Sequence, residues 1–168
     1  MRPGPVVKLT FPATSVVPLK TGFVRTFPVA GDHSYIDDWG AARPQGGHQG
    51  TDIMASRSTP VVAADGGTIV KMTRTETGLG GIYLWLRRAD GIQYYYAHMQ
   101  SIADGLDIGS TVPAGQVVGT VGNSGDARSG PTHLISRYVA SGRPSTRIRS
   151  WSPSILTTPP RRPRRDPG

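Results

Sequence analysis

The chain has 168 residues, a net charge of +8 and no cysteine. The lack of cysteine excludes a disulfide scaffold and a thiolate metal site, so any metal must be held by histidine and carboxylate. High contents of glycine and proline, 22 and 15 residues, favour short strands and turns over helices. No apolar run approaches the length of a membrane span, and no apolar segment with a cleavage site follows the N-terminus. We therefore expect neither a membrane span nor a signal peptide.

The positive charge is concentrated at one end of the chain. Residues 1–135 contain 11 basic and 10 acidic side chains, whereas residues 136–168 contain 8 arginines and 1 aspartate. The basic character therefore describes a tail rather than the main domain, and we do not expect the domain to bind nucleic acid. A nucleic-acid binder that acts electrostatically through the RRPRR segment at 161–165 remains as a rival hypothesis.

The pattern of residues predicts an all-β domain between two irregular ends. We expect an irregular lead-in over 1–22 and a disordered tail, rich in arginine, proline and serine, over 140–168. Between them, residues 32–50 read as a loop, and Pro28 limits a strand over Phe23–Gly31 to the edge of a sheet. The segments expected to form short strands lie at 51–55, 60–64, 67–72 and 110–122.

The clearest element is a β-hairpin over residues 81–99. Ile82, Leu84 and Leu86 alternate on one face of its first strand. An Asp-Gly pair at 90–91 supplies the turn. No segment between 23 and 135 has a convincing helical period, so the sequence predicts an antiparallel β-domain.

Four histidines are available for chemistry. His48 and Asp52 form an H-x-x-x-D pattern that enters a strand, and an imidazole with a carboxylate suits a zinc ion. Alone the pair is weak evidence, because a loop histidine and a capping aspartate would look the same. His98 ends an aromatic strand and His133 follows a Ser-Gly-Pro turn, and each is unremarkable by itself. His33, in a polar turn, receives no role.

Taken in order, these motifs carry a family resemblance. The segments GGHQGTDI, YYYAHM and GNSGDARSGPTHL, with the residues around them, resemble the LytM/lysostaphin-type zinc endopeptidases that cut peptidoglycan. The resemblance implies a small antiparallel β-sheet or barrel-sandwich domain over 23–139 with a metal-binding groove. It also implies zinc as cofactor, peptidoglycan peptide as substrate, and an extracellular or cell-wall location. It gives no oligomeric state.

The resemblance assigns roles to single residues. His48 and Asp52 match the first two zinc ligands, and His98 and His133 match the two catalytic histidines. The third ligand of the family is the second histidine of an H-x-H pair, and here that position is Ile135. We therefore predict a weakened zinc site with two of three ligands and an impaired endopeptidase. The alternative is an inactive module that binds cell-wall peptide or activates another hydrolase.

The break at Ile135 suggests a shifted reading frame. With suitable synonymous codons, one added base before Ile135 turns the following residues into His-Phe-Ala-Ile-Arg-Arg, as the family pattern requires. The jump in positive charge at the same point agrees with this. We therefore hypothesise that residues 135–168 come from a frameshift or a sequencing error. Residues 136–139 keep strand-forming side chains and are expected to fill an edge position.

Overall fold

The computed structural model describes residues 25–36, 38–44 and 46–139. The predicted lead-in (1–22) and the predicted disordered tail (140–168) lie outside these residues. The described chain is nearly all antiparallel β-structure, which confirms the predicted fold class. Its one described helical segment is the single 3-10 turn η1 (Gly125–Ala127). No helix among the described residues has the length and apolar character needed to cross a membrane.

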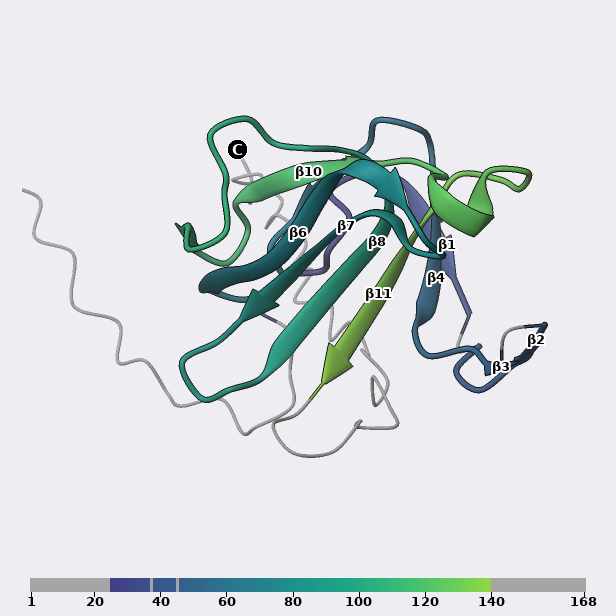
Figure 1. Ribbon diagram of the computed structural model, residues 1–168, viewed down its shortest axis with the longest axis horizontal. Helices are drawn as coiled ribbons and strands as arrows, with labels where there is room; N and C mark the ends of the chain where they lie inside the picture. Colours follow the sequence, from purple (N-terminus) through teal and green to yellow (C-terminus); the bar gives the residue numbers. More distant parts are fainter. Residues whose placement is uncertain (1–24, 37, 45, 140–168) are drawn as a thin grey trace, which may run out of the picture.

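The strands begin and end as follows: β1 (His33–Tyr35), β2 (Ala42–Arg43), β3 (Gly46–Gly47), β4 (Thr51–Ala55), β5 (Pro60–Val62), β6 (Gly67–Thr77), β7 (Gly81–Arg87), β8 (Gln93–Ile102), β9 (Thr111–Val112), β10 (Val117–Val121) and β11 (His133–Val139). The main sheet runs in the order β1-β4-β11-β8-β7-β6-β9, and β10 pairs with β5 and β8. Figure 1 shows β6, β7, β8 and β11 side by side. The last described strand, β11, was expected at an edge of the sheet. It lies instead between β4 and β8.

The central position of β11 has a clear physical basis. Its residues pair with β4 from His133 to Ser136 and with β8 from Ile135 to Val139. Leu134 and Ser136 are buried on the core side, while His133, Ile135 and Arg137 alternate onto the other face. The chain after Leu134 thus keeps the period of a strand, even though its residues depart from the family pattern.

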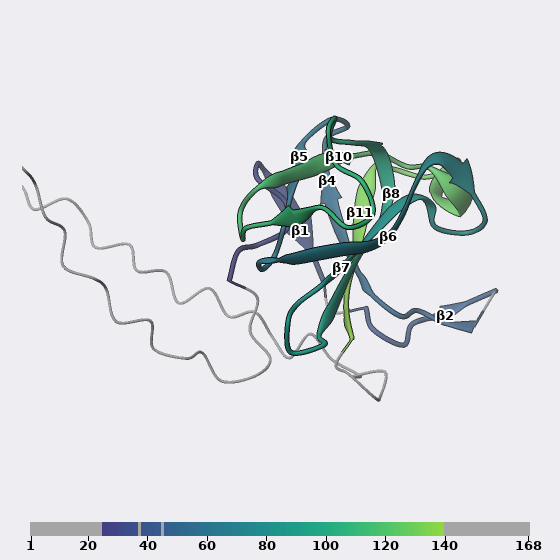
Figure 2. The same cartoon turned by 60° about the vertical axis from the view of Figure 1, so that its left-hand side comes forward.

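Three other predictions are corrected. In the part of Phe23–Gly31 that the structure describes, only Val29 forms a β-bridge, because Pro28 has no N–H to extend the ladder. The expected strand pair at 110–122 forms β9 and β10, but β9 pairs with β6 and β10 pairs with β5 and β8, and the turn between β9 and β10 is hydrogen-bonded to Ala63. The predicted loop at 32–50 contains β1 and the ribbon β2–β3, which projects from the main sheet in Figures 1 and 2.

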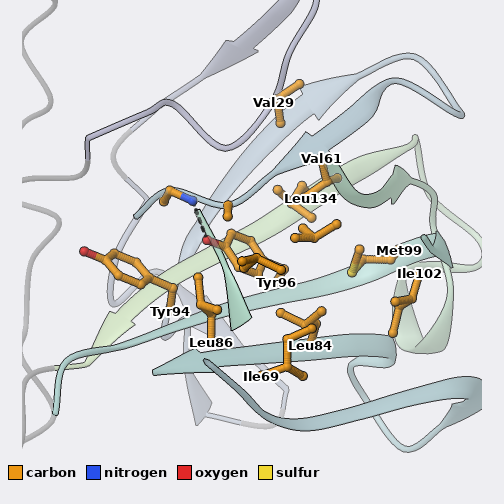
Figure 3. Packing of buried hydrophobic residues seen from close by; sticks show 14 of the residues in the cluster. Val29, Val61, Ile69, Leu84, Leu86, Tyr94, Tyr96, Met99, Ile102 and Leu134 are labelled. Carbon is orange, nitrogen blue, oxygen red and sulfur yellow. Dashed lines mark hydrogen bonds between the residues drawn. The ribbon is translucent and has the colours of Figure 1, made fainter. Parts of the chain in front are cut away.

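The hydrophobic core lies on one side of the sheet and is closed by β5 and β10. Leu84 and Leu86 are fully buried, as the alternation in the hairpin predicted, and Leu134 and Met99 join them. Tyr96 is also fully buried, and its hydroxyl accepts a hydrogen bond of 2.9 Å from the Ala64 N–H (Figure 3). Burial raises the pKa of this phenol, so it stays neutral.

Removal of this hydroxyl tests the core. Tyr96→Phe is expected to lower the free energy of unfolding by about 1–3 kcal/mol, because the buried Ala64 N–H would lose its acceptor. Urea denaturation measures the change, with Tyr83→Phe as the control at a less buried tyrosine. Equal unfolding free energies for the two variants would contradict the prediction.

Candidate metal centre and groove

The predicted ligands His48 and Asp52 lie together at the start of β4. His48 Nε2 and Asp52 Oδ1 are 3.2 Å apart. Both atoms are buried, and neither makes a hydrogen bond. Two buried polar atoms in this state are costly unless something binds both of them.

A zinc ion fits this pair of atoms. Zinc bonds to nitrogen and oxygen measure about 2.0–2.2 Å, so two ligands of a tetrahedral ion lie about 3.3 Å apart. The observed 3.2 Å agrees with that spacing. The imidazole and the carboxylate therefore have the spacing that two ligands of a tetrahedral zinc ion require.

Asp38 orients the His48 ring from the opposite side. His48 Nδ1 lies 2.9 Å from Asp38 Oδ2, and the imidazole N–H donates to this carboxylate. This bond fixes the tautomer that leaves Nε2 with its lone pair toward Asp52. Asp38, His48 and Asp52 bring ligand atoms within 4.8 Å of one another. Because Asp38 binds Nδ1, it serves as an outer partner of the ligand rather than as a third ligand.

Arg43 joins the two carboxylates. Arg43 Nη2 donates to Asp38 Oδ2 at 3.0 Å and to Asp52 Oδ2 at 2.8 Å. The hydrogen bond to Asp52 is the main reason that the pKa of Arg43 is raised. Asp52 thus uses one oxygen for Arg43 and keeps Oδ1 free to face His48.

The outer carboxylate gives a direct prediction. Asp38→Asn is expected to lower zinc affinity by about 10–100-fold, because a neutral amide oxygen accepts the His48 Nδ1–H bond more weakly and raises the basicity of Nε2 less than a carboxylate does. Competition with a chromogenic chelator measures the affinity, and Asp104→Asn in an exposed turn is the control. Unchanged affinity in Asp38→Asn would show that Asp38 has no part in the site.

His133 lies beside the same carboxylate. Its Nδ1 is 3.0 Å from the Pro131 carbonyl, which identifies Nδ1–H as the donor and leaves a lone pair on Nε2. That Nε2 lies 3.9 Å from Asp52 Oδ1. The backbone of His133 is held in turn by its N–H, which donates to the Gly122 carbonyl at 3.0 Å.

His98 faces His133 across the groove because of a β-bulge. Tyr96 pairs with Leu84 and Met99 with Ile82, so Ala97 and His98 lie opposite a single residue of β7. His98 also has a φ of 59°, an unusual conformation for a residue with a side chain. The two imidazole rings meet edge to face, with centroids 5.0 Å apart.

The electrostatics of His98 favour a neutral ring. Burial is the main cause that lowers its pKa, and the neighbouring His133 lowers it further. His98 Nδ1 lies 2.7 Å from the Ser124 carbonyl, to which it donates. Its Nε2 therefore carries a lone pair at neutral pH, and it lies 3.6 Å from Asp126 Oδ1. Such a ring can accept a proton from a molecule in the groove.

Ile135 is the position at which the family resemblance predicted a third ligand. It pairs across the sheet with Asp52, so the two side chains share a face. A Cβ built on Gly50 would lie 2.5 Å from the Ile135 Cγ2 methyl group and 3.6 Å from His48 Nε2. The Ile135 methyl group and His48 Nε2 thus both lie near the same side of Gly50, and the methyl group offers no ligand atom.

The four predicted site residues and Ile135 lie in one open groove. It is lined by the predicted residues His48, Asp52, His98 and His133, by Ile135, and by residues of β3, β8, β11 and η1. His33 lies outside it and stacks on Phe27 with ring centroids 4.1 Å apart. Sequence reasoning missed Asp38, Arg43 and Asp126. Of these three, only Asp38 had a signal in the sequence, because it is a carboxylate just before the glycine-rich loop that carries His48.

The fold and the groove define a class of protein: an all-β domain with a histidine–aspartate metal pair and two further histidines. Comparison with known proteins gives the family. Residues 46–145 match the model of peptidase family M23, and the chain therefore belongs to this family. The match continues ten residues beyond Ile135, so the family likeness does not end at the break.

Relatives agree with this assignment. The chain is 35% identical to the L-Ala–D-Glu endopeptidase of Bacillus subtilis (strain 168), over 74% of this chain and 42% of that protein. It is 32% identical to the peptidoglycan DD-endopeptidase ShyC of Vibrio cholerae, over 56% of this chain and 21% of that protein. The catalytic domain of lysostaphin from Staphylococcus simulans superposes with a TM-score of 0.57 at 28% identity, over 68% and 86% of the two chains. The chain spans less than half the length of these two curated relatives.

Proposed function

We propose that this domain is a zinc metalloendopeptidase that hydrolyses peptide bonds in peptidoglycan cross-bridges or stems, with an impaired metal site. The observation that carries the proposal is the buried pair His48 Nε2 and Asp52 Oδ1, 3.2 Å apart and free of hydrogen bonds, in a groove with two histidines. The names of the two curated relatives support the choice of substrate. An extracellular or cell-wall location goes with that substrate.

Each residue has a defined part in this proposal. His48 and Asp52 hold the zinc ion, and Asp38 and Arg43 hold these two ligands in place. When bound, zinc lowers the pKa of a coordinated water to about 7 and polarises the scissile carbonyl. His98 and His133 are placed to accept a proton at Nε2, and a ring that has taken up the proton donates this Nε2–H to the oxygen on which negative charge develops before it returns the proton.

The impairment follows from Ile135. Structural and catalytic zinc sites use at least three protein ligands, and among the residues that the structure describes only His48 and Asp52 offer ligand atoms at the required spacing. His133 Nε2 lies 3.9 Å from Asp52 Oδ1, which is longer than the separation of about 3.3 Å between two ligands of a tetrahedral zinc ion. We therefore expect the chain to retain zinc weakly. The hypothesis of a shifted frame from residue 135 stays a prediction, which resequencing of the DNA around codon 135 decides.

The same observation favours a second candidate function. A groove with a weak metal site is suited to hold a cell-wall peptide without cutting it, or to activate another hydrolase. Zinc content after dialysis and chromatography of fragments released from purified peptidoglycan separate the two. Tight stoichiometric zinc with full cleavage would contradict the impairment. Sedimentation with peptidoglycan without cleavage would favour the binding module.

A further inference from the structure

Arg137 lies in the groove, and no described carboxylate forms an ion pair with it. It follows Ile135 on the same face of β11, and it lines the groove together with Gln49 and Tyr95. Its guanidinium carbon lies 5.0 Å from the centroid of the Trp85 ring and 5.3 Å from that of Tyr95. These aromatic faces hold the planar group in a fixed position and are themselves attractive to a cation.

The hydrogen bonds of this guanidinium are only partly satisfied. Nη1 donates to Gln49 Oε1 at 2.7 Å. Nε is buried and makes no hydrogen bond. Within the described part of the chain, no carboxylate forms an ion pair with Arg137, and burial is the main cause that lowers its pKa. The arginine thus bears a desolvation cost that no acidic residue described here offsets.

We infer that Arg137 is a subsite for a carboxylate of the peptide in the groove. This inference rests on the proposed function, and it concerns what this chain binds, whatever the origin of residues 135–168. It names the class of substrate that the groove selects. A guanidinium presents its N–H groups as a planar fork that matches the two oxygens of a carboxylate. Trp85 and Tyr95 hold the plane of the fork, Gln49 holds one nitrogen, and the buried Nε–H is the donor left without an acceptor.

The position along β11 separates this subsite from the reacting groups. Arg137 is four residues beyond His133, which is about 13 Å along a strand. The carboxylate is therefore recognised at a distance from the bond that is cut, and Arg137 contributes to substrate choice rather than to proton transfer. Peptidoglycan stem peptides carry free or amidated carboxylates, and the groove is expected to discriminate between these two forms.

The test compares two ligands on the full chain. Soluble stem peptides with free carboxylates, and the same peptides with their carboxylates amidated, are titrated calorimetrically. In parallel, the Arg137 Nε–H signal is followed by ¹H–¹⁵N NMR. The free form is expected to bind about tenfold more tightly and to shift the Nε–H signal, because charged hydrogen bonds contribute most at desolvated sites. Arg137→Gln is expected to remove the preference and to leave binding of the amidated peptide unchanged, which also shows that the variant folds. Arg87→Gln, on the exposed end of β7, is the matched control.

The outcomes are distinct. Equal binding of both peptides, or a preference that survives in Arg137→Gln, would overturn the carboxylate subsite while leaving the proposed function intact. If neither peptide binds the unsubstituted chain, the proposed function fails and the inference fails with it. If Arg87→Gln also removes the preference for the free carboxylate, the preference comes from the general positive charge of the chain. That result would also overturn the carboxylate subsite at Arg137.

Discussion

Replacement of Ile135 by histidine is expected to raise zinc affinity by about a hundredfold or more and to restore cleavage of peptidoglycan. Ile135 pairs directly with Asp52 across β4 and β11, so its side chain shares a face with the ligand carboxylate. Cross-strand neighbours place their Cβ atoms about 4.5–5.5 Å apart, within reach of a shared ion for a histidine ring. Loss of an outer partner already costs 10–100-fold in metal affinity, and a direct ligand contributes more.

The control for Ile135→His is a second substitution that also introduces a ring. Ile135→Phe introduces a ring of similar shape that offers no ligand atom, and it tests whether packing alone changes the site. Chelator competition gives zinc affinity, and chromatography of released fragments gives activity. Equal zinc affinities for the histidine and phenylalanine variants would contradict the assignment of this position. Stoichiometric zinc and full activity in the unsubstituted chain would contradict it as well.

The local sequence was sufficient to predict the longer strands and the positions of His48, Asp52, His98 and His133, which line the groove. Alternating apolar residues at Ile82, Leu84 and Leu86 predicted β7, and burial of Leu84 and Leu86 confirms that pattern. Positions 133 and 135 lie two residues apart in β11 and therefore share a face, and both line the groove. Both features depend on the period of a single strand, which neighbouring residues determine.

Long-range pairing could not be predicted in the same way. The insertion of β11 between β4 and β8 depends on hydrogen bonds between segments more than 35 residues apart. The outer contact of His48 with Asp38 spans ten residues across a glycine-rich loop, and no periodicity connects its two ends. The β-bulge that turns His98 toward the groove also arises from pairing with β7, since residues 97 and 98 alone do not reveal it.

The two groove histidines are expected to act on catalysis and not on metal binding. In the Ile135→His background, His98→Gln and His133→Gln are each expected to lower kcat by about 10²–10⁴-fold. Zinc affinity should change little, because His133 Nε2 lies 3.9 Å from Asp52 Oδ1, farther than two ligands of one tetrahedral ion, and His98 Nε2 lies beside Asp126. His33→Gln is the matched control, since His33 stacks on Phe27 outside the groove.

The pH dependence gives His98 a signature of its own. Burial and the nearby His133 lower the pKa of His98, so its ring is neutral at pH 7 and becomes protonated only below the ordinary histidine value of 6.5. Activity of the Ile135→His variant should therefore hold at neutral pH and fall on the acidic side, where the protonated ring can no longer accept a proton. The His98→Gln variant should lose this acidic decline along with most of its rate. If instead His133→Gln or His98→Gln releases zinc, the residue concerned is a ligand, and the division between metal-binding and proton-transferring residues would have to be redrawn.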